Sequence, residues 1–441
     1  MTCLHWSAAL RTGAVAAFVF ISTPVLAQEP DLGSLRSALE SLKSDSAARI
    51  AALEARIAEL ERTAAANAAA ATAPAAPAPA ASGGGSSASA FNPSISVILS
   101  GGYTDTSLDP SSYRIGGFIP AGDGVGPGSR GFSLSESELT LAANVDPYFF
   151  ANLTASVAAD DTIHVEEAYA KTIALPSGLS VKGGRFFSGI GYLNEIHSHA
   201  WDFVDQPLVY QAMLNGQYAQ DGAQLKWVAP SVLFVELAAE AGDGQSFPGT
   251  ALSRNGLNST ALMAHLGADV GDSTSWRAGI SWMTQQAEDR VFDDTLANGS
   301  VVANAFTGDS RLWVADATLK WSPHGNAQLH SLKLQGEYMQ RVESGATLTT
   351  AGYHNRQSGW YVQGVYQFLP RWRIGTRYDS LDSGMPHVAP SRASLMLDWN
   401  PSEFTRLRAQ YALDEARTTA NDNQWRLQYL YSIGAHGAHK F

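Results

Sequence analysis

The sequence predicts an all-β transmembrane barrel of about sixteen antiparallel strands, preceded by a short α-helical coiled coil. First, the last predicted strand alternates with a period of two, apolar on one face and polar on the other, as barrel strands do between lipid and lumen. Second, short proline turns alternate with longer polar segments from residue 91 onward. Third, no segment after residue 27 offers about 18 consecutive apolar residues, so no transmembrane helix is expected. The apolar face of the last strand consists of Trp425, Leu427, Tyr429, Tyr431 and Ile433.

Residues 1–27 are expected to be a secretory signal peptide. Arg11 precedes an apolar run that is followed by small residues ending at Ala27, which is the pattern of a cleaved signal. The apolar run is too short to be retained as a membrane helix. Cys3 is the sole cysteine of the chain, so the mature protein has no disulfide and no thiolate metal ligand.

Residues 28–65 are expected to form a coiled-coil helix. Leucines and isoleucines recur at spacings of three and four, in two runs separated by a stutter that locally unwinds a left-handed coil. The alternative is a short amphipathic helix that packs on its own barrel. The Ile-before-Leu order of the seam favours a dimer. The seam consists of Leu32, Leu35, Leu39, Leu42, Ile50, Leu53, Ile57 and Leu60.

Residues 66–90 are rich in alanine, proline, glycine and serine and predict an extended, flexible linker. The barrel is expected to span residues 91–441. Its strand ends are marked by prolines, which cannot donate to a ladder, and by nearby aromatic residues typical of a membrane interface. The longer connections are predicted at Thr104–Arg130, Ser188–Gln220, Gly242–Ser259, Gln285–Asp309 and Glu343–Asn355.

Arginines occupy the inward positions of four consecutive predicted strands near the C-terminus. Their sequence neighbours are apolar and point outward, where an arginine near the midplane would cost about 2–4 kcal/mol. Because adjacent strands lie about 4.8 Å apart, these guanidiniums should form one basic patch. The alternative is that they pair with Asp379, Asp398 and Asp414 as scaffolding of the lumen. The predicted pore-lining residues are Arg371, Arg373, Arg377, Arg392, Arg406, Arg408, Arg426 and, on an earlier strand, Lys182.

The segment Ser188–Gln220 is expected to be the third long loop on its side of the barrel, and it carries the acids Glu195, Asp202 and Asp205. An acidic loop facing a basic wall would create a transverse field that filters solutes by charge and dipole.

His197 and His199 of the same segment are candidate zinc ligands. A His-x-His pair places both imidazoles on one side of an extended segment, and zinc accepts nitrogen and oxygen donors. The alternative is that these histidines pack the loop. We expect no other cofactor.

Two functional classes are disfavoured. The net charge of −12 argues against a nucleic-acid partner. No nucleophile elbow, phosphate-binding loop or His-Glu-x-x-His motif is present, so an enzyme is not expected. The remaining enzymatic alternative would pair Asp202 with His199 near the rim of the barrel.

Residues 91–441 resemble Gram-negative outer-membrane porins. The resemblance is carried by GFSLSESELTLAANVDPYFFANL, by VEEAY and by Lys182–Phe186 with the loop that follows. These stretches are similar to an uncharacterised group of proteobacterial outer-membrane proteins that are distantly similar to the phosphate-selective porins. The terminal Phe441 resembles the assembly signal of such barrels, and residues 28–65 resemble the periplasmic extension of the sucrose porin.

The resemblance implies an oligomeric state and a constriction of the pore. Porins are usually trimers, and their third extracellular loop folds into the barrel and narrows it. Some relatives are labelled zinc-regulated or siderophore receptors, but such receptors need a 22-stranded barrel and a plug domain, which about 350 residues cannot supply.

We therefore expect a homo-oligomer in the lipid of the cell outer membrane, a trimer or a dimer, with its N-terminal segment in the periplasm. Its expected function is passive diffusion of small hydrophilic solutes, including anions. The alternatives are a zinc-binding or metal-responsive uptake protein and a structural tether of the envelope.

Overall fold

The computed structural model describes residues 40, 93–120, 125–158, 162–250, 252, 255–295 and 301–434. The chain divides into two compact units, Met1–Gly85 and Ser86–Phe441. Glu40, an exposed residue of a helix, is the described residue of the first unit. The signal peptide, the coiled-coil seam, the linker and the terminal Phe441 lie outside the described residues, so these expectations stay predictions.

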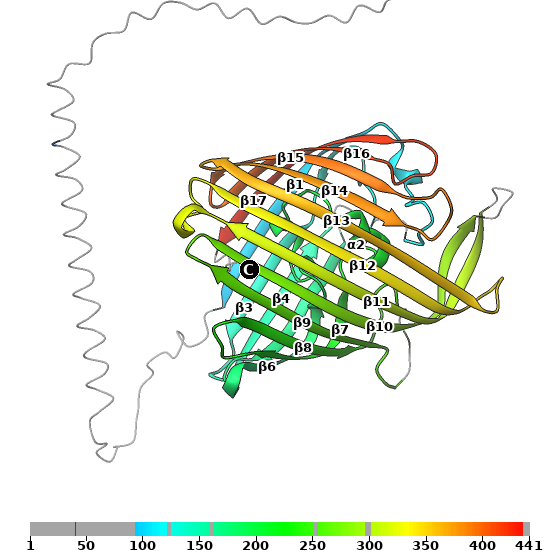
Figure 1. Cartoon of the computed structure of the whole chain (residues 1–441), viewed down its shortest axis with the longest axis horizontal. Helices are drawn as coiled ribbons and strands as arrows, with labels where there is room; N and C mark the ends of the chain where they lie inside the picture. Colours follow the sequence, from blue (N-terminus) through cyan, green and yellow to red (C-terminus); the bar gives the residue numbers. More distant parts are fainter. Residues whose placement is uncertain are drawn as a thin grey trace, which may run out of the picture. The chain divides into compact units, whose positions relative to one another are not determined.

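The second unit is a closed antiparallel β-barrel (Figure 1). From β3 onward each strand pairs with the next one in sequence, and β1 closes the ring by pairing with β17 on one side and with β2 and β3 on the other. Because β2 and β3 are successive pieces of one strand position, seventeen segments make sixteen positions, and the predicted number is confirmed.

The bounds of the strands follow the chain. The first half consists of β1 (Ser94–Thr106), β2 (Gly131–Leu134), β3 (Ser137–Asn144), β4 (Phe149–Val157), β5 (Ile163–Thr172), β6 (Leu179–Phe187), β7 (Ala219–Val228), β8 (Phe234–Gly242) and β9 (Ser259–Val270). The second half consists of β10 (Thr274–Thr295), β11 (Val301–Trp321), β12 (Ser331–Thr347), β13 (Tyr353–Leu369), β14 (Trp372–Asp382), β15 (Ser391–Ser402), β16 (Thr405–Asp414) and β17 (Asp422–Gly434). Among the described residues, the α-helix that belongs to this unit is α2 (Leu208–Leu214).

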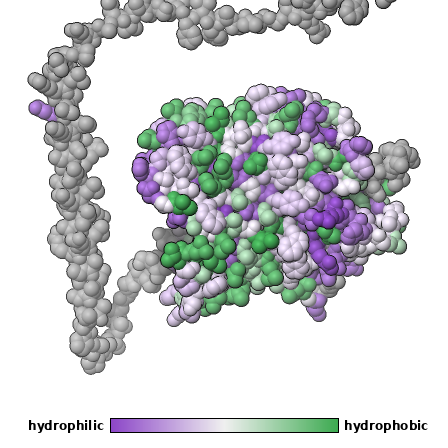
Figure 2. Space-filling model, in the orientation of Figure 1, coloured by the Kyte–Doolittle hydropathy of each residue, from purple (hydrophilic) through white to green (hydrophobic). Residues whose placement is uncertain are grey.

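The alternation predicted for β17 is confirmed, because its apolar residues are exposed on the outside of the ring and Arg426 is buried inside it. The same outward parity recurs on other strands, and green apolar surface is visible on the barrel in Figure 2. An outer surface of this kind suits lipid rather than water. Within the described residues, no helix is long and apolar enough to cross a membrane. Exposed apolar residues of the outer face include Leu99, Leu153, Leu225, Leu266, Ile280, Trp313, Leu334, Val362, Ile374, Leu397 and Ile433.

Short turns and long loops lie at opposite ends of the barrel, as the antiparallel order requires. We call the end with the short turns the turn end and the other the loop end. Pro176 and Pro323 start 3₁₀ turns η3 (Pro176–Gly178) and η5 (Pro323–Gly325) at the turn end. Pro401 lies in the last residues of β15. Prolines thus end strands at this edge because they cannot donate to the next ladder bond.

Two predicted loops are wrong. Gln285–Asp309 continues β10 and β11 as a paired hairpin that extends beyond its neighbours (Figure 1), with a bulge between Ala287 and Arg290. Glu343–Asn355 likewise belongs largely to β12 and β13. Their polar composition suggested loops, but a hairpin that leaves the membrane has no need for an apolar face on either side.

Candidate functional site

The connection between β6 and β7, residues 188–218, turns into the barrel, and we call it the inward loop. It contains the 3₁₀ turn η4 (Ser198–Ala200) and helix α2, every residue of which is buried. The apolar side chains of α2 pack against inward residues of the wall such as Met283, Val314 and Met339. An apolar patch inside a polar lumen holds the loop on one side of the barrel, on β9 to β14.

The ends of α2 are set by local sequence. Pro207 precedes the first helical residue, and Asn215 adopts the left-handed conformation that ends helices. The Arg341 guanidinium of β12 donates to the carbonyl oxygens of Ala212 (3.3 Å) and Met213 (3.1 Å) at the C-terminal end of the helix. A cation at that position suits the negative end of the helix dipole.

Glu337 of β12 anchors the start of the inward loop. The backbone amides of Tyr192 and Leu193 each donate to its carboxylate at 3.1 Å, and the hydroxyl of Tyr210 donates to Oε2 at 2.8 Å. Gly191 has a φ of +67°, and a Cβ at this position would overlap Glu337 Oε2. The left-handed glycine therefore lets the backbone approach the carboxylate closely.

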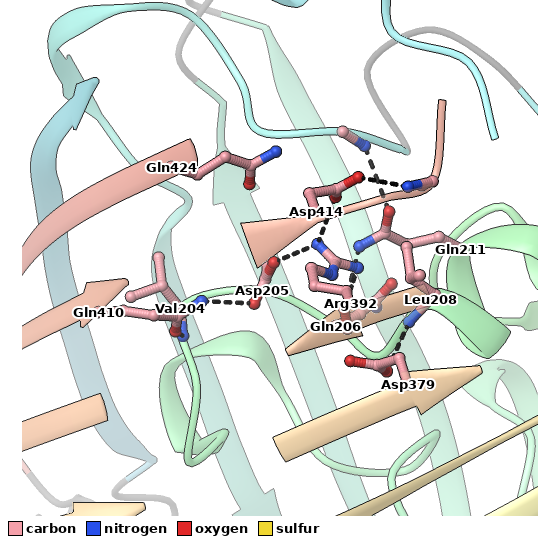
Figure 3. A network of polar contacts seen from close by, with 12 residues as sticks. Val204, Asp205, Gln206, Leu208, Gln211, Asp379, Arg392, Gln410, Asp414 and Gln424 are labelled. Atoms are coloured by element: carbon pink, nitrogen blue, oxygen red, sulfur yellow. Dashed lines mark hydrogen bonds and ion pairs between the residues drawn. The ribbon is translucent and has the colours of Figure 1, made fainter. Parts of the chain in front are cut away.

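Asp205 anchors the middle of the inward loop to three wall arginines. Figure 3 shows one of these contacts, between Asp205 and Arg392. The Asp205 carboxylate lies 2.8 Å from Arg377, 2.6 Å from Arg392 and 3.0 Å from Arg426. Gln410 donates a further hydrogen bond to it at 2.9 Å. Burial alone raises the pKa of Asp205, but the three guanidiniums outweigh that effect and hold its pKa well below the usual value.

Asp202 makes the same kind of contact nearer the turn end. It lies 2.9 Å from Lys333 and 3.1 Å from Arg373. Burial raises its pKa, yet the nearby cations lower it overall. Asp398 of β15 pairs with both Arg373 and Arg408. Because Arg373 also contacts Asp202, these acids and arginines form one continuous network.

The predicted arginines are thus brought together, and the loop lies directly on them. The expectation that Asp202 and Asp205 face the arginines across an open passage is wrong, because both acids form direct ion pairs with them. Tertiary folding places the acids on the wall, since a loop that covers the arginines must compensate the charges it buries. The alternative expected from sequence, that arginines pair with Asp379 and Asp398, applies at the same time, since Arg377 also lies 2.9 Å from Asp379.

Other predicted site residues lie elsewhere. Arg371 is exposed in the turn before β14, and with Arg373 and Arg406 it lines a shallow hollow at the turn end. Lys182 lies on β6, with its ammonium over the rings of Tyr169 and Phe186. Arg406 and Arg408 both donate to the carbonyl oxygen of Trp201.

The described residues of the first loop, 107–120 and 125–130, also turn inward. Tyr113, Ile115, Phe118 and Val125 join the apolar cluster around α2, and Gly126 N donates to Gln211 Oε1 at 3.3 Å. The two loops together cover the β9–β17 side of the lumen at the level of α2.

Among the described residues, two large cavities lie between the inward loop and the wall formed by strands β1 to β10. The loop-end cavity, of about 810 Å³, is lined by residues that include Glu166, Arg185 and Arg426. The turn-end cavity, of about 690 Å³, is lined by Lys171, Lys182 and Lys226, and by Glu195 of the loop. Glu195 of the loop lies 3.7 Å from Lys226 of β7.

His197 and His199 lie between these cavities and contact glutamates of the wall. His197 Nδ1 lies 2.9 Å from Glu166 and 3.3 Å from Glu138, and its Nε2 lies 3.1 Å from Glu167. His199 Nδ1 lies 2.8 Å from Glu138. Burial lowers the pKa of His197, but the hydrogen bonds to the three carboxylates outweigh burial and raise the pKa well above its usual value.

Sequence reasoning missed these glutamates. Glu166 and Glu167 are adjacent, so a regular strand would send one of them outward. A bulge in β5 prevents this, since Thr154 pairs with Glu167 and Ala155 with Val165, which leaves Glu166 as an extra residue. The adjacent acid pair in an alternating strand was the available signal for a bulge.

Comparison with known proteins gives one relative and a set of similar folds. An uncharacterized protein of Aquifex aeolicus (strain VF5) is 33% identical over 343 residues, which cover 71% of this chain and 70% of the relative. No family model matches.

Among solved structures, a loop-deletion mutant of OmpT, an outer membrane protein of Vibrio cholerae, aligns with a TM-score of 0.50 and 11% identity, covering 78% of this chain and 99% of that one. The outer membrane channel DcaP of Acinetobacter baumannii aligns at 0.49 with 13% identity (78% and 96% covered). The anion-selective porin of Comamonas acidovorans aligns at 0.49 with 10% identity (78% and 99% covered). At this identity the likeness to OmpT concerns the fold.

Proposed function

Because the chain belongs to the same family as the uncharacterized Aquifex aeolicus protein and has the fold of outer-membrane porins, we propose that it is a channel of the outer membrane. Small hydrophilic solutes diffuse through it passively. The observation that carries this proposal is the position of the inward loop, which lies within a closed barrel on one wall and leaves cavities along the other.

The proposed passage runs between the inward loop and strands β1 to β10. Solutes enter the loop-end cavity, pass the level of Phe187, which lines both cavities, and leave through the turn-end cavity. The inward loop therefore narrows the channel by occupying the opposite half of the lumen. The arginine network acts by holding the loop in place.

We infer that any preference for anions comes from lysines of the passage, one of which, Lys182, was predicted to line the pore, and not from the predicted arginines. Arg377, Arg392 and Arg408 are buried beneath the loop and paired with acids, so solutes do not reach them. Lys171 and Lys182 line the turn-end cavity. We infer that these lysines, on β5 and β6, attract anions into the passage.

We keep two further proposals from the sequence. The protein forms a homo-oligomer, with a trimer as the first candidate and a dimer as the alternative. Its N-terminal segment lies in the periplasm. Chemical crosslinking in intact outer membranes tests the first, and protease access to residues 28–65 in intact and in permeabilised cells tests the second.

Reconstitution in planar lipid bilayers tests the channel itself. The refolded chain should give discrete, long-lived conductance steps in symmetric potassium chloride. As a test of the route, Ser133→Trp should reduce the size of the step, because Ser133 of β2 lines the loop-end cavity. Gly183→Trp is the matched control, because Gly183 follows the inward Lys182 on β6 and so faces outward, and no atom lies within 4 Å of the position its Cβ would take. Folded protein that gives no discrete openings contradicts the proposal.

A further inference from the structure

A compact group of imidazole and carboxylate side chains lies where the two cavities meet. Phe187 lines both cavities, Glu166 lines the loop-end cavity, and His197 and Glu167 line the turn-end cavity. The group is therefore enclosed by protein but can be reached by an ion from either end of the barrel.

The donor atoms of this group are already arranged around one point. His197 Nδ1 lies 3.3 Å from Glu138 Oε2 and 2.9 Å from Glu166 Oε2. One donor atom from each of these three side chains lies within 4.8 Å of the other two. Ligands held at about 2.0–2.1 Å around a tetrahedral zinc ion are separated by roughly 3.3 Å. Small side-chain movements would therefore close the three donors around one ion.

A fourth donor could come from His199 or Glu167. The His199 ring stacks on that of His197 with centroids 5.8 Å apart, and His199 Nδ1 contacts the other oxygen of Glu138 at 2.8 Å. Glu167 contacts His197 from the opposite side of the ring. The contacts from His199 and Glu167 hold the His197 ring in place, so the surroundings of the ring are preorganised.

The charges of the group also favour a cation. The side chain of Glu138 is 1% exposed and that of Glu166 is 10% exposed, and the ion pairs that each forms here are with imidazoles. Glu166 Oε1 is buried without a hydrogen-bond partner. The imidazole of His197 meets three carboxylates, so negative charge is in excess around it. Enclosed excess charge is costly, and a divalent ion that displaces the His197 proton would supply the missing positive charge.

We propose that His197, Glu138 and Glu166 bind a divalent transition-metal ion of the zinc class, with His199, Glu167 or water completing the coordination. A nitrogen donor among oxygens favours this class, because Mg²⁺ and Ca²⁺ take oxygen ligands. The sequence suggested His197 and His199, and the tertiary structure adds glutamates from β3 and β5. Binding at this position does not require that the barrel conducts.

Calorimetric titration of the full refolded chain with zinc chloride tests the proposal. The background should carry His436→Ala and His439→Ala, because these histidines near the C-terminus could bind zinc themselves. We expect one zinc ion per chain and at least a tenfold loss of affinity in His197→Gln. The matched control is His265→Gln, which removes another buried histidine that contacts two acids, Glu236 and Asp316. No zinc binding, or unchanged binding in His197→Gln, overturns the proposal.

A second variant separates loss of the ligand from loss of the fold. Glu166→Gln keeps the shape of the side chain and should also weaken zinc binding at least tenfold, while the barrel keeps its heat-modifiable mobility in electrophoresis. Zinc-edge absorption should give nitrogen and oxygen ligands, and an oxygen-only shell overturns the proposal. Displacement of zinc by equimolar Mg²⁺ would show that the group binds divalent cations without selectivity. That result would also overturn the proposal.

Conductance distinguishes this inference from the proposed function. If the chain is a porin, zinc should lower its single-channel conductance, and a chelator should restore it, in the parent chain but not in His197→Gln. Zinc binding without any conductance would leave the metal site intact and contradict the channel.

Discussion

Asp205 of the inward loop lies 2.6 Å from Arg392 of β15, 187 positions away in the sequence. The same carboxylate also contacts Arg377 and Arg426, so one acid joins the loop to three strands of the wall. This contact determines which half of the lumen is filled and, in the proposed channel, which half remains for solutes.

Removing that acid should release the loop. In Asp205→Ala, three arginines lose a buried partner, and breaking a buried pair in this way costs about 3–5 kcal/mol. We expect larger and noisier conductance steps and faster chymotrypsin cleavage within residues 188–218. The control is Asp272→Asn, which changes an acid exposed at the turn end. Wild-type conductance and cleavage in Asp205→Ala would show that the arginines do not hold the loop.

The loop should stay docked in mildly acidic solution. The folded-state pKa values of Asp202 and Asp205 are lowered, so their stabilising contribution is present above the unfolded value of about 3.9 and is lost as the pH falls through the lower folded values. The groups facing them are Lys333, the wall arginines and, through Arg392, Asp414. Conductance should therefore change little between pH 7 and pH 4 and rise only in stronger acid. An increase already between pH 5 and pH 4 would contradict this assignment.

Gly191→Ala should destabilise the loop more than its backbone conformation alone requires. An alanine in the left-handed region costs about 1–2 kcal/mol, and here its Cβ would also overlap the Glu337 carboxylate. Gly271 is a matched control, because it has a φ of +66° and no atom within 4 Å of the position its Cβ would take. Unfolding midpoints in urea should fall further for Gly191→Ala than for Gly271→Ala. Equal shifts would mean that the close approach of Gly191 to the Glu337 carboxylate does not contribute to stability.

Anion preference should depend on Lys182 rather than on the arginine network. Replacing Lys182 and Lys171 with glutamine removes two positive charges from the lining of the turn-end cavity. We expect the reversal potential in a potassium chloride gradient to shift toward cation preference. The neutral change Arg408→Gln with Asp398→Asn removes a buried pair and should leave the reversal potential unchanged. A shift of the reversal potential in the arginine variant but not in the lysine variant would show that the arginines determine the selectivity.

Much of the fold could be predicted because the alternation of apolar and polar residues along a barrel strand indicates which face meets lipid and which meets the lumen. Trp425 and Leu427 point outward and Arg426 inward for the same local reason, the period of two, and Pro176 and Pro323 mark strand ends because they lack a donor. The hairpin Gln285–Asp309 was predicted wrongly, since outside the membrane neither face of a strand needs to be apolar. The bulge at Glu166 was missed because it depends on the register with β4.

The sequence by itself determined the two-residue period, the number of strands, the inward arginines and the acids of the third loop, since each of these follows from local pattern or counting. Only the tertiary structure decided that Asp205 lies on the arginines instead of facing them, that α2 packs on an apolar patch of the lumen, and that His197 meets Glu138 and Glu166. These contacts join residues that are far apart in the chain, and their partners are selected by barrel closure and register, which no local pattern specifies.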